Sequence, residues 1–165
     1  MALVESFSGL IALSARLLNP LQALVAFATR LYVCDVFLRS GWLKLSTWDS
    51  TLSLFETEYH VPVLPPHVAA VVGTFGELFF PALLIVGLAG RLSAAGLFFV
   101  NAMAVISYAH VLLSDGFEAA LGQHVLWGFM LLVLAAYGPG PISVDRLLTH
   151  VRRPSAAMTP SAAAY

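Results

Sequence analysis

Charged side chains are rare in this sequence, and several of them stand inside long apolar segments. One such segment carries Arg30, Asp35, Arg39 and Lys44, and another carries Glu77 as its single charged residue. A charged side chain at the centre of a bilayer costs about 2.5–3.5 kcal/mol even on a lenient insertion scale, so such groups are kept for pairing or for function. These residues are the first candidates for a functional site.

The four charges of the first segment fall on two faces of a helix. At about 100° per residue, Arg30 and Lys44 share one face, whereas Asp35 and Arg39 lie on the nearly opposite face. Asp35 and Arg39 are four residues apart with the acid first, so they can neutralise one another, or they can reach the interface by extending their side chains. Arg30 is expected near mid-span, where it needs an acid from another helix.

Glu77 is the expected partner of Arg30. It lies near the middle of its own apolar segment, and Gly73 and Gly76 beside it allow another helix to approach closely. We therefore expect Arg30 and Glu77 to meet in the interior of a helix bundle. Loss of either partner would leave the other buried without a counter-charge.

Four further polar residues lie on the third and fourth apolar segments. Asn101 and Tyr108 are seven residues apart and so share a helix face, while His110 and His124 are expected at the same depth on consecutive helices. Two histidines at matching depth could ligate haem or a metal ion. The alternative is that both are interfacial histidines bonded to backbone or water.

The composition is that of a membrane protein. The 165 residues are 59% hydrophobic and 10% charged, against roughly 45–50% and 25% in a soluble domain. The net charge of −1 and the lack of a basic cluster argue against nucleic acid as a partner. Cys34 is the one cysteine, which excludes a disulfide within the chain and dithiol–disulfide exchange by this chain alone.

The apolar segments predict an all-α fold, an integral membrane four-helix bundle in a single domain, because about 20 residues cross the hydrocarbon core. The expected spans are 21–43, 67–89, 92–112 and 123–138. Residues 1–18 are expected to form an interfacial helix that ends at Pro20, and residues 154–165 a disordered tail. Trp48, Leu52, Phe55 and Tyr59 follow a helical spacing, which predicts a short amphipathic lid helix in the first outer loop.

The loop charges predict the orientation. If both termini are cytoplasmic, the inside holds most of the arginines and the outside holds one lysine and most of the acids, in agreement with the positive-inside rule. The expected inside residues are Arg16, Arg91, Arg146, Arg152 and Arg153, and the expected outside residues are Lys44, Asp49, Glu56, Glu58, Asp115 and Glu118.

Several motifs together resemble the DoxX family. "RLYVCDVFLRSGWLKL" is similar to the first-helix signature of that family, and "FGELFFPALLIVGLAGRLSA" to the second. "WDSTLSLFETEYHVPVLPP" and "GPGPISVDRLL" resemble one branch of it, so that the likeness covers roughly residues 25–148. By resemblance, the recurrent charged positions of the family are Arg30, Lys44, Glu77 and Arg91, and the recurrent glycines are Gly41 and Gly87.

The resemblance implies a four-helix bundle of the bacterial inner membrane. It also implies redox chemistry, as a subunit of thiosulfate:quinone oxidoreductase in one lineage and as a partner of superoxide-detoxifying proteins in oxidative stress in another. Relatives of this branch are associated with small metal-binding peptide systems. Asp35 and Arg39 look like features of the branch, and a fold-level likeness is a weak guide to reaction.

Three functions follow from these residues. The first is a redox-linked membrane subunit with a quinone head group among Arg30, Glu77, Asn101 and Tyr108, its electrons coming from a soluble or membrane partner. The alternative is a non-enzymatic anchor or assembly partner for a soluble redox or metal-handling protein. A small-ligand transporter is the third, and four helices are few for that unless the chain forms a homo-oligomer. Whether the chain is an enzyme stays open.

Overall fold

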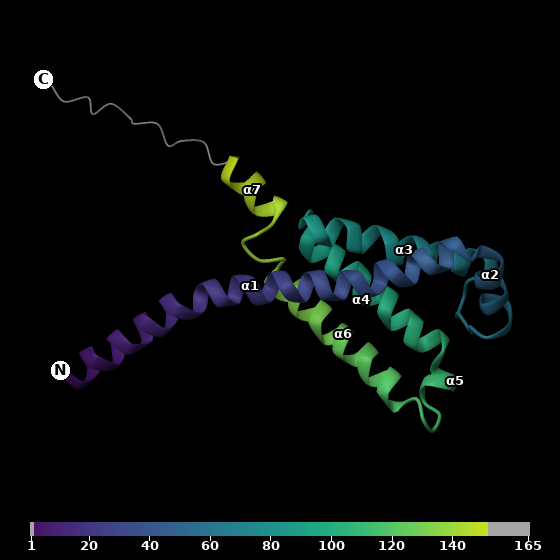
Figure 1. Ribbon diagram of the computed structural model, residues 1–165, viewed down its shortest axis with the longest axis horizontal. Helices are drawn as coiled ribbons and strands as arrows, with labels where there is room; N and C mark the ends of the chain where they lie inside the picture. Colours follow the sequence, from purple (N-terminus) through teal and green to yellow (C-terminus); the bar gives the residue numbers. More distant parts are fainter. Residues whose placement is uncertain (1, 152–165) are drawn as a thin grey trace, which may run out of the picture.

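The computed structural model describes residues 2–151, apart from the side chains of residues 2–6, 8 and 10. Within this range the regular structure is helical throughout (Figure 1), so the predicted all-α fold is confirmed. The helices are α1 (Ala2–Ser46), α2 (Trp48–Thr57), α3 (Pro66–Val86), α4 (Gly90–Ser107), α5 (Ala109–Leu112), α6 (Glu118–Tyr137) and α7 (Val144–Val151). The predicted tail at 154–165 lies outside the described residues.

Four of these helices are long and apolar enough to cross a membrane, as the sequence predicts: α1 over Ile11–Ser46, α3, α4 and α6. The second half of α1 packs along α3, α3 packs on α4, and α4 packs on α6. The shared core includes Val33 and Phe37 of α1, Leu84 of α3, Leu97 of α4 and Leu131 of α6. Many large apolar side chains face outward instead, which fits a bundle solvated by lipid.

Glycines set the closest approaches of α3 to its neighbours. A Cβ atom at Gly76 would lie 2.7 Å from a methyl carbon of Val100 on α4, and one at Gly73 would lie 3.5 Å from the ring of Phe55 on α2. The expectation that these glycines admit another helix is therefore met at Gly76, by α4, whereas the distance at Gly73 is that of an ordinary contact with α2. Small residues serve this purpose in membrane bundles because backbones can then pack directly.

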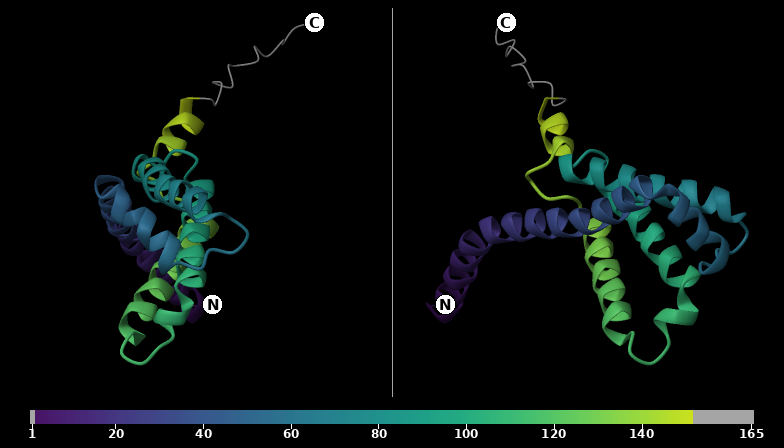
Figure 2. Two further views of the ribbon diagram at one scale, coloured as in Figure 1. Left: turned by 90° about the vertical axis from the view of Figure 1, so that its right-hand side faces the viewer. Right: turned by 45° about the vertical axis from the view of Figure 1, so that its right-hand side comes forward.

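The N-terminal segment differs from its prediction. The interfacial helix expected over residues 1–18 should end at Asn19-Pro20, whereas α1 continues through Pro20 without interruption. A single proline removes one helical hydrogen bond, and the apolar helix formers on both sides maintain the helix. The N-terminal part of α1 bends and extends beyond the bundle (Figure 2). Its position along a membrane surface stays a prediction.

The predicted lid helix is present as α2. It begins two residues after α1 ends, buries Thr51 and Phe55, and packs against Ala69 and Ala70 of α3. Trp48, Leu52 and Tyr59, the other members of the predicted apolar stripe, lie beside this contact. The end of the bundle covered by α2 is called the lid end below.

The opposite end of the bundle is closed by main-chain contacts and is called the Gly87 end. Gly87 ends α3 in the left-handed conformation, with φ of 70°. The carboxylate of Asp145 accepts hydrogen bonds from the N–H groups of Ala89 and Gly90, at 2.8 and 2.7 Å, where α4 begins. The N–H of Asp145 donates to the carbonyl of Gly87 at 3.0 Å. The segment after α6 is thereby fastened to the α3–α4 turn.

Candidate functional site

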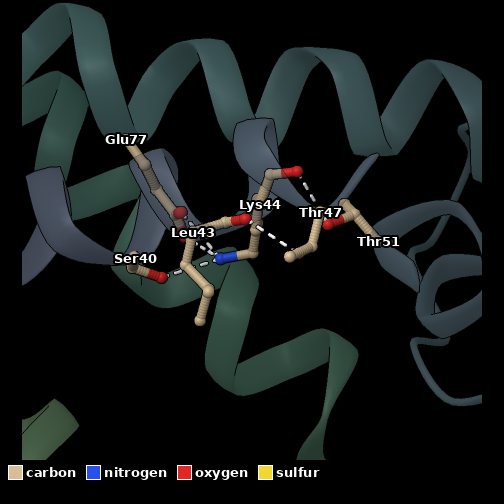
Figure 3. Close-up of polar contacts among 6 residues, drawn as sticks. All are labelled: Ser40, Leu43, Lys44, Thr47, Thr51 and Glu77. Atoms are coloured by element: carbon tan, nitrogen blue, oxygen red, sulfur yellow. Dashed lines mark hydrogen bonds and ion pairs between the residues drawn. The ribbon is translucent and has the colours of Figure 1, made fainter. Parts of the chain in front are cut away.

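Lys44 and Glu77 form a buried ion pair between α1 and α3 (Figure 3). The Lys44 ammonium donates to both carboxylate oxygens of Glu77, at 2.8 and 2.7 Å, and to the hydroxyl of Ser40 at 2.8 Å. The exposed fractions of the two charged side chains are 17% and 9%. All three donors of the ammonium therefore have acceptors, which is the condition for keeping such a charge inside a bundle.

The local sequence brings the two helices together at this point. A Cβ atom at Gly41 would lie 2.9 Å from a side-chain carbon of Leu78 and 3.0 Å from Cβ of Glu77, so only glycine permits this approach of α1 to α3. The hydroxyl of Thr51 donates to the carbonyl of Lys44 at 2.9 Å and ties α2 to the same turn (Figure 3).

The predicted contact between Arg30 and Glu77 is wrong. The exposed fraction of Arg30 is 1%, and its guanidinium donates to the carbonyl oxygens of Pro139 at 2.9 Å and Ile142 at 2.8 Å. The ring of Phe27 lies 5.1 Å from its central carbon. The Arg30 guanidinium is thus stabilised by two main-chain carbonyls at the Gly87 end, whereas Glu77 pairs with Lys44.

The physical reason is the axial position of α1. Arg30 and Lys44 are 14 residues apart, or about 21 Å along a helix, and they share a face. The structure places Arg30 beside Gly87, at the end of α3, and Lys44 beside Glu77, near the middle of α3. Arg30 therefore lies at the Gly87 end and not at mid-span, where it was expected. Lys44 reaches the Glu77 carboxylate near the middle of α3 instead.

Asn101 and His124 form a second polar contact, between α4 and α6. The amide nitrogen of Asn101 donates to the backbone carbonyl of His124 at 3.0 Å, and its amide oxygen lies 2.9 Å from Nδ1 of the His124 ring. Because a carbonyl oxygen only accepts, this orientation of the amide requires Nδ1 to carry the proton. The neutral ring then presents Nε2 as a hydrogen-bond acceptor.

The predicted pair His110 and His124 is divided between two places. Nδ1 of His110 lies 3.3 Å from Nδ1 of His60 at the lid end, whereas His124 contacts Asn101. Residues 2–151 include no group of three or more histidine, cysteine or acidic side chains arranged to hold a metal ion. Haem or metal ligation by His110 and His124 stays a prediction.

A cavity of about 490 Å³ lies beneath α2 and between α1, α3, α4 and α6. This volume is within the usual range of small-molecule sites, roughly 300–1,000 Å³. Most of its lining is apolar, from Phe55 and Phe80 to Met103. The polar side chains that line it are Ser40, Lys44, Tyr59, Glu77, Ser107, Tyr108 and His124. The predicted residues that line this cavity are therefore Lys44, Glu77, Tyr108 and His124. Asn101 positions His124 through hydrogen bonds. Arg30 does not line the cavity.

Two of the residues that line the cavity are also exposed on the outside of the bundle. Val72 of α3 and Phe99 of α4 both line it, and both are exposed on the surface of these adjacent helices. This surface faces the hydrocarbon in a membrane, so the two residues mark a route by which a molecule in the bilayer would enter between α3 and α4. Such a site suits a lipid-soluble molecule with a polar end.

The predicted pair of Asp35 and Arg39 forms, but it lies away from the cavity. Nε of Arg39 is 2.8 Å from one carboxylate oxygen of Asp35, and the exposed fractions of these side chains are 80% for Arg39 and 57% for Asp35. Both lie on the outward face of α1. Of the residues predicted for one polar site, the structure therefore separates Arg30, Asp35 and Arg39 from the other four.

Sequence reasoning did not identify Ser40, Tyr59 and His60 as part of this region. Ser40 precedes Lys44 by one helical turn, which is a readable signal for a hydrogen bond along α1. Tyr59 belongs to the apolar stripe of α2, and burial among Glu77 and Tyr108 raises its pKa above the ordinary value. His60 has no signal of its own, because its contact with His110 joins residues 50 positions apart.

Comparison with known proteins identifies the family. The DoxX family model matches residues 25–110, which is just over half of the chain. No curated protein and no solved structure matches this chain. The matched region includes Arg30, Lys44 and Glu77 together with all of α2, α3 and α4. With four helices that can cross a membrane, the protein is a multi-pass integral membrane protein in contact with the lipid bilayer, and the chain belongs to the DoxX family.

Proposed function

We propose that this DoxX protein is a redox-linked membrane subunit that binds a quinone in the cavity beneath α2. One observation about the cavity carries this proposal. A mostly apolar cavity is lined both by exposed residues of α3 and α4, Val72 and Phe99, and by polar groups near the middle of α3, and we take the exposed residues to mark its entrance from the bilayer. A molecule with an apolar tail and a polar ring fits such a site better than a water-soluble substrate does.

The lining side chains match the hydrogen-bonding needs of a quinone. The hydroxyls of Tyr59 and Tyr108 belong to residues that line the cavity, and each can donate a hydrogen bond to a ring oxygen. His124 offers Nε2 as an acceptor for the hydroxyl of the reduced form, because Asn101 holds its Nδ1–H. Lys44 and Glu77 add a fixed, paired charge at the same level.

A bound quinone would supply two-electron, two-proton chemistry, and a partner redox protein would exchange the electrons. The residues of this chain handle the protons. On oxidation of the quinol form, His124 would accept one of the two hydroxyl protons at Nε2, and the amide oxygen of Asn101 would stabilise the resulting imidazolium through the Nδ1–H bond. The apolar walls keep bulk water from this transfer.

The test is to purify the protein in mild detergent, extract the bound organic molecules and record an oxidised-minus-reduced spectrum. Gly73→Leu places a side chain in the cavity, whereas Gly122→Leu is the matched control, because a Cβ atom at Gly122 meets nothing within 4 Å. We expect quinone in the wild-type protein and the control and a loss in Gly73→Leu. A folded wild-type protein that contains and takes up no quinone contradicts the proposal.

A second function, that of an anchor or assembly partner, is favoured by one observation. The two inward-facing cations of α1 have their partners inside the chain, Arg30 in two carbonyls that accept from its terminal nitrogens and Lys44 in Glu77 and Ser40. Buried charges satisfied in this way can specify helix register without taking part in chemistry. An empty cavity together with copurification of one soluble redox or metal-handling protein supports this function over the first.

The proposed location is the bacterial inner membrane with both termini in the cytoplasm. Arg91 and Arg146 lie near the Gly87 end, and Asp49, Glu56 and Glu58 lie on or beside α2 at the lid end. The positive-inside rule then makes the Gly87 end cytoplasmic. A reporter fused after Tyr165 should be active inside the cell, and activity restricted to the outside contradicts this orientation.

A further inference from the structure

The outward face of α1 carries charges where a lone bundle would meet lipid. Asp35 and Arg39 pair with each other, yet neither contacts another helix through a hydrogen bond or ion pair among the described residues. Both side chains are more than half exposed. In contrast, the charges on the opposite face of α1 bind groups inside the bundle: Arg30 donates to two carbonyls, and Lys44 pairs with Glu77.

The position of this pair along α1 makes lipid an unsuitable neighbour. Arg30 marks the Gly87 end of the bundle, and Arg39 follows nine residues later, about 13 Å further along the helix. Lys44, beyond Arg39, is level with the middle of α3. In a hydrocarbon core about 30 Å thick, Arg39 therefore lies close to the centre, too deep for its side chain to reach either interface.

The same face has the spacing of a helix–helix contact. The outward-facing positions of α1 recur at intervals of four and three residues, which is the repeat of two helices packed at a small left-handed angle. One such series is Leu24, Ala28, Leu31, Asp35, Leu38 and Trp42, and exposed residues beside it are Val25, Tyr32, Arg39 and Leu43. All of them are exposed or half-buried, so nothing in the described chain covers this face. The small side chain of Ala28 allows the closest approach.

We propose that this face is the interface between two copies of the chain, with α1 packed against α1 of the second copy around a twofold axis along the membrane normal. A twofold interface must be complementary to itself. One acid and one base separated by one turn satisfy this condition, because each copy's Asp35 lies at the same depth as the other's and within a turn of the other's Arg39. The four charges sum to zero, and the dimer replaces lipid around them with protein.

Cross-linking in membranes tests the interface directly. Ala28→Cys should form a dimer on mild oxidation, since the two copies of this position lie next to the axis. Phe129→Cys is the matched control, because Phe129 is exposed on α6 and lies on another face. Wild-type Cys34 is fully buried and should give no product. A monomer with Ala28→Cys, or a cross-link to a different protein, overturns the proposal.

A charge swap provides the second test and does not depend on oxidation. Asp35→Arg places four cations together and should lower the dimer fraction, measured by native mass spectrometry, by at least about tenfold. The double variant Asp35→Arg/Arg39→Asp restores self-complementarity and should return the dimer to near the wild-type fraction. Both residues are exposed in the single chain, so these changes remove no contact within the bundle, and the circular dichroism spectrum of each variant verifies its fold. Equal dimer fractions in all three proteins contradict the charged interface.

Discussion

Lys44 and Glu77 form the one buried ion pair among the described residues, and it joins the end of the first membrane helix to the middle of the second. Ser40 and the α2 lid complete its surroundings through short hydrogen bonds. The pair is at once part of the helix packing and part of the cavity lining. Its removal should therefore affect both stability and binding.

Lys44→Met should lower the free energy of unfolding by about 3–5 kcal/mol, because the Glu77 carboxylate then stays buried without a counter-charge. Thermal unfolding of the purified protein in detergent measures the effect. The double variant Lys44→Met/Glu77→Met removes both charges and should recover most of the loss. A single variant that unfolds at the wild-type temperature would show that the pair is not buried as described.

Arg30→Met should loosen the Gly87 end without disturbing Lys44 and Glu77. The carbonyls of Pro139 and Ile142 lose their donors, at about 1–3 kcal/mol for each buried group. Amide hydrogen exchange in residues 138–145 should become faster. Glu77→Gln is the control, since it should leave hydrogen exchange in residues 138–145 unchanged. Equal acceleration of exchange in both variants would indicate that Arg30 and Glu77 belong to one site, which contradicts the structure.

Gly87→Ala should destabilise the protein, whereas Gly122→Ala should not. The left-handed backbone at Gly87 costs a non-glycine residue about 1–2 kcal/mol, and a Cβ atom there would lie 2.9 Å from the backbone of Ser143 and 3.0 Å from the Arg30 guanidinium. At Gly122 a Cβ atom meets nothing, and alanine is the better helix former by about 0.8–1.0 kcal/mol. Opposite shifts in the unfolding temperature are expected, and equal shifts would contradict the close contact at Gly87.

Tyr59 should make the lid end sensitive to alkaline pH. Burial raises its pKa above the unfolded value of about 10, with smaller contributions from Glu77 and Tyr108. The folded state thus holds the phenolic proton more tightly, so stability is fully present below about pH 10 and falls as the pH rises through the folded pKa. Unfolding temperatures between pH 8 and 11 should fall less in Tyr59→Phe than in wild type. Tyr137→Phe, at an exposed position, should behave as wild type does.

Local patterns of the sequence are enough to predict several of these features. The apolar segments predict the membrane helices, the stripe from Trp48 to Tyr59 predicts α2, and the spacing of Asp35 and Arg39 predicts their pair. Each of these features depends on residues close together in the chain. The break expected at Pro20 failed because one missing hydrogen bond does not end a helix whose neighbours all favour it.

By itself, the sequence determined the helical membrane fold, the family and the set of polar residues available for a site. Tertiary structure alone decided which of them meet. Arg30 and Lys44 share a face of α1, so angular position could not choose between them as partner of Glu77, and the choice depended on the axial offset of α1 against α3. That offset is set by Gly41 against α3 and by the carbonyls after α6 at the Gly87 end. Contacts between residues far apart in the chain fix it, and no local pattern encodes them.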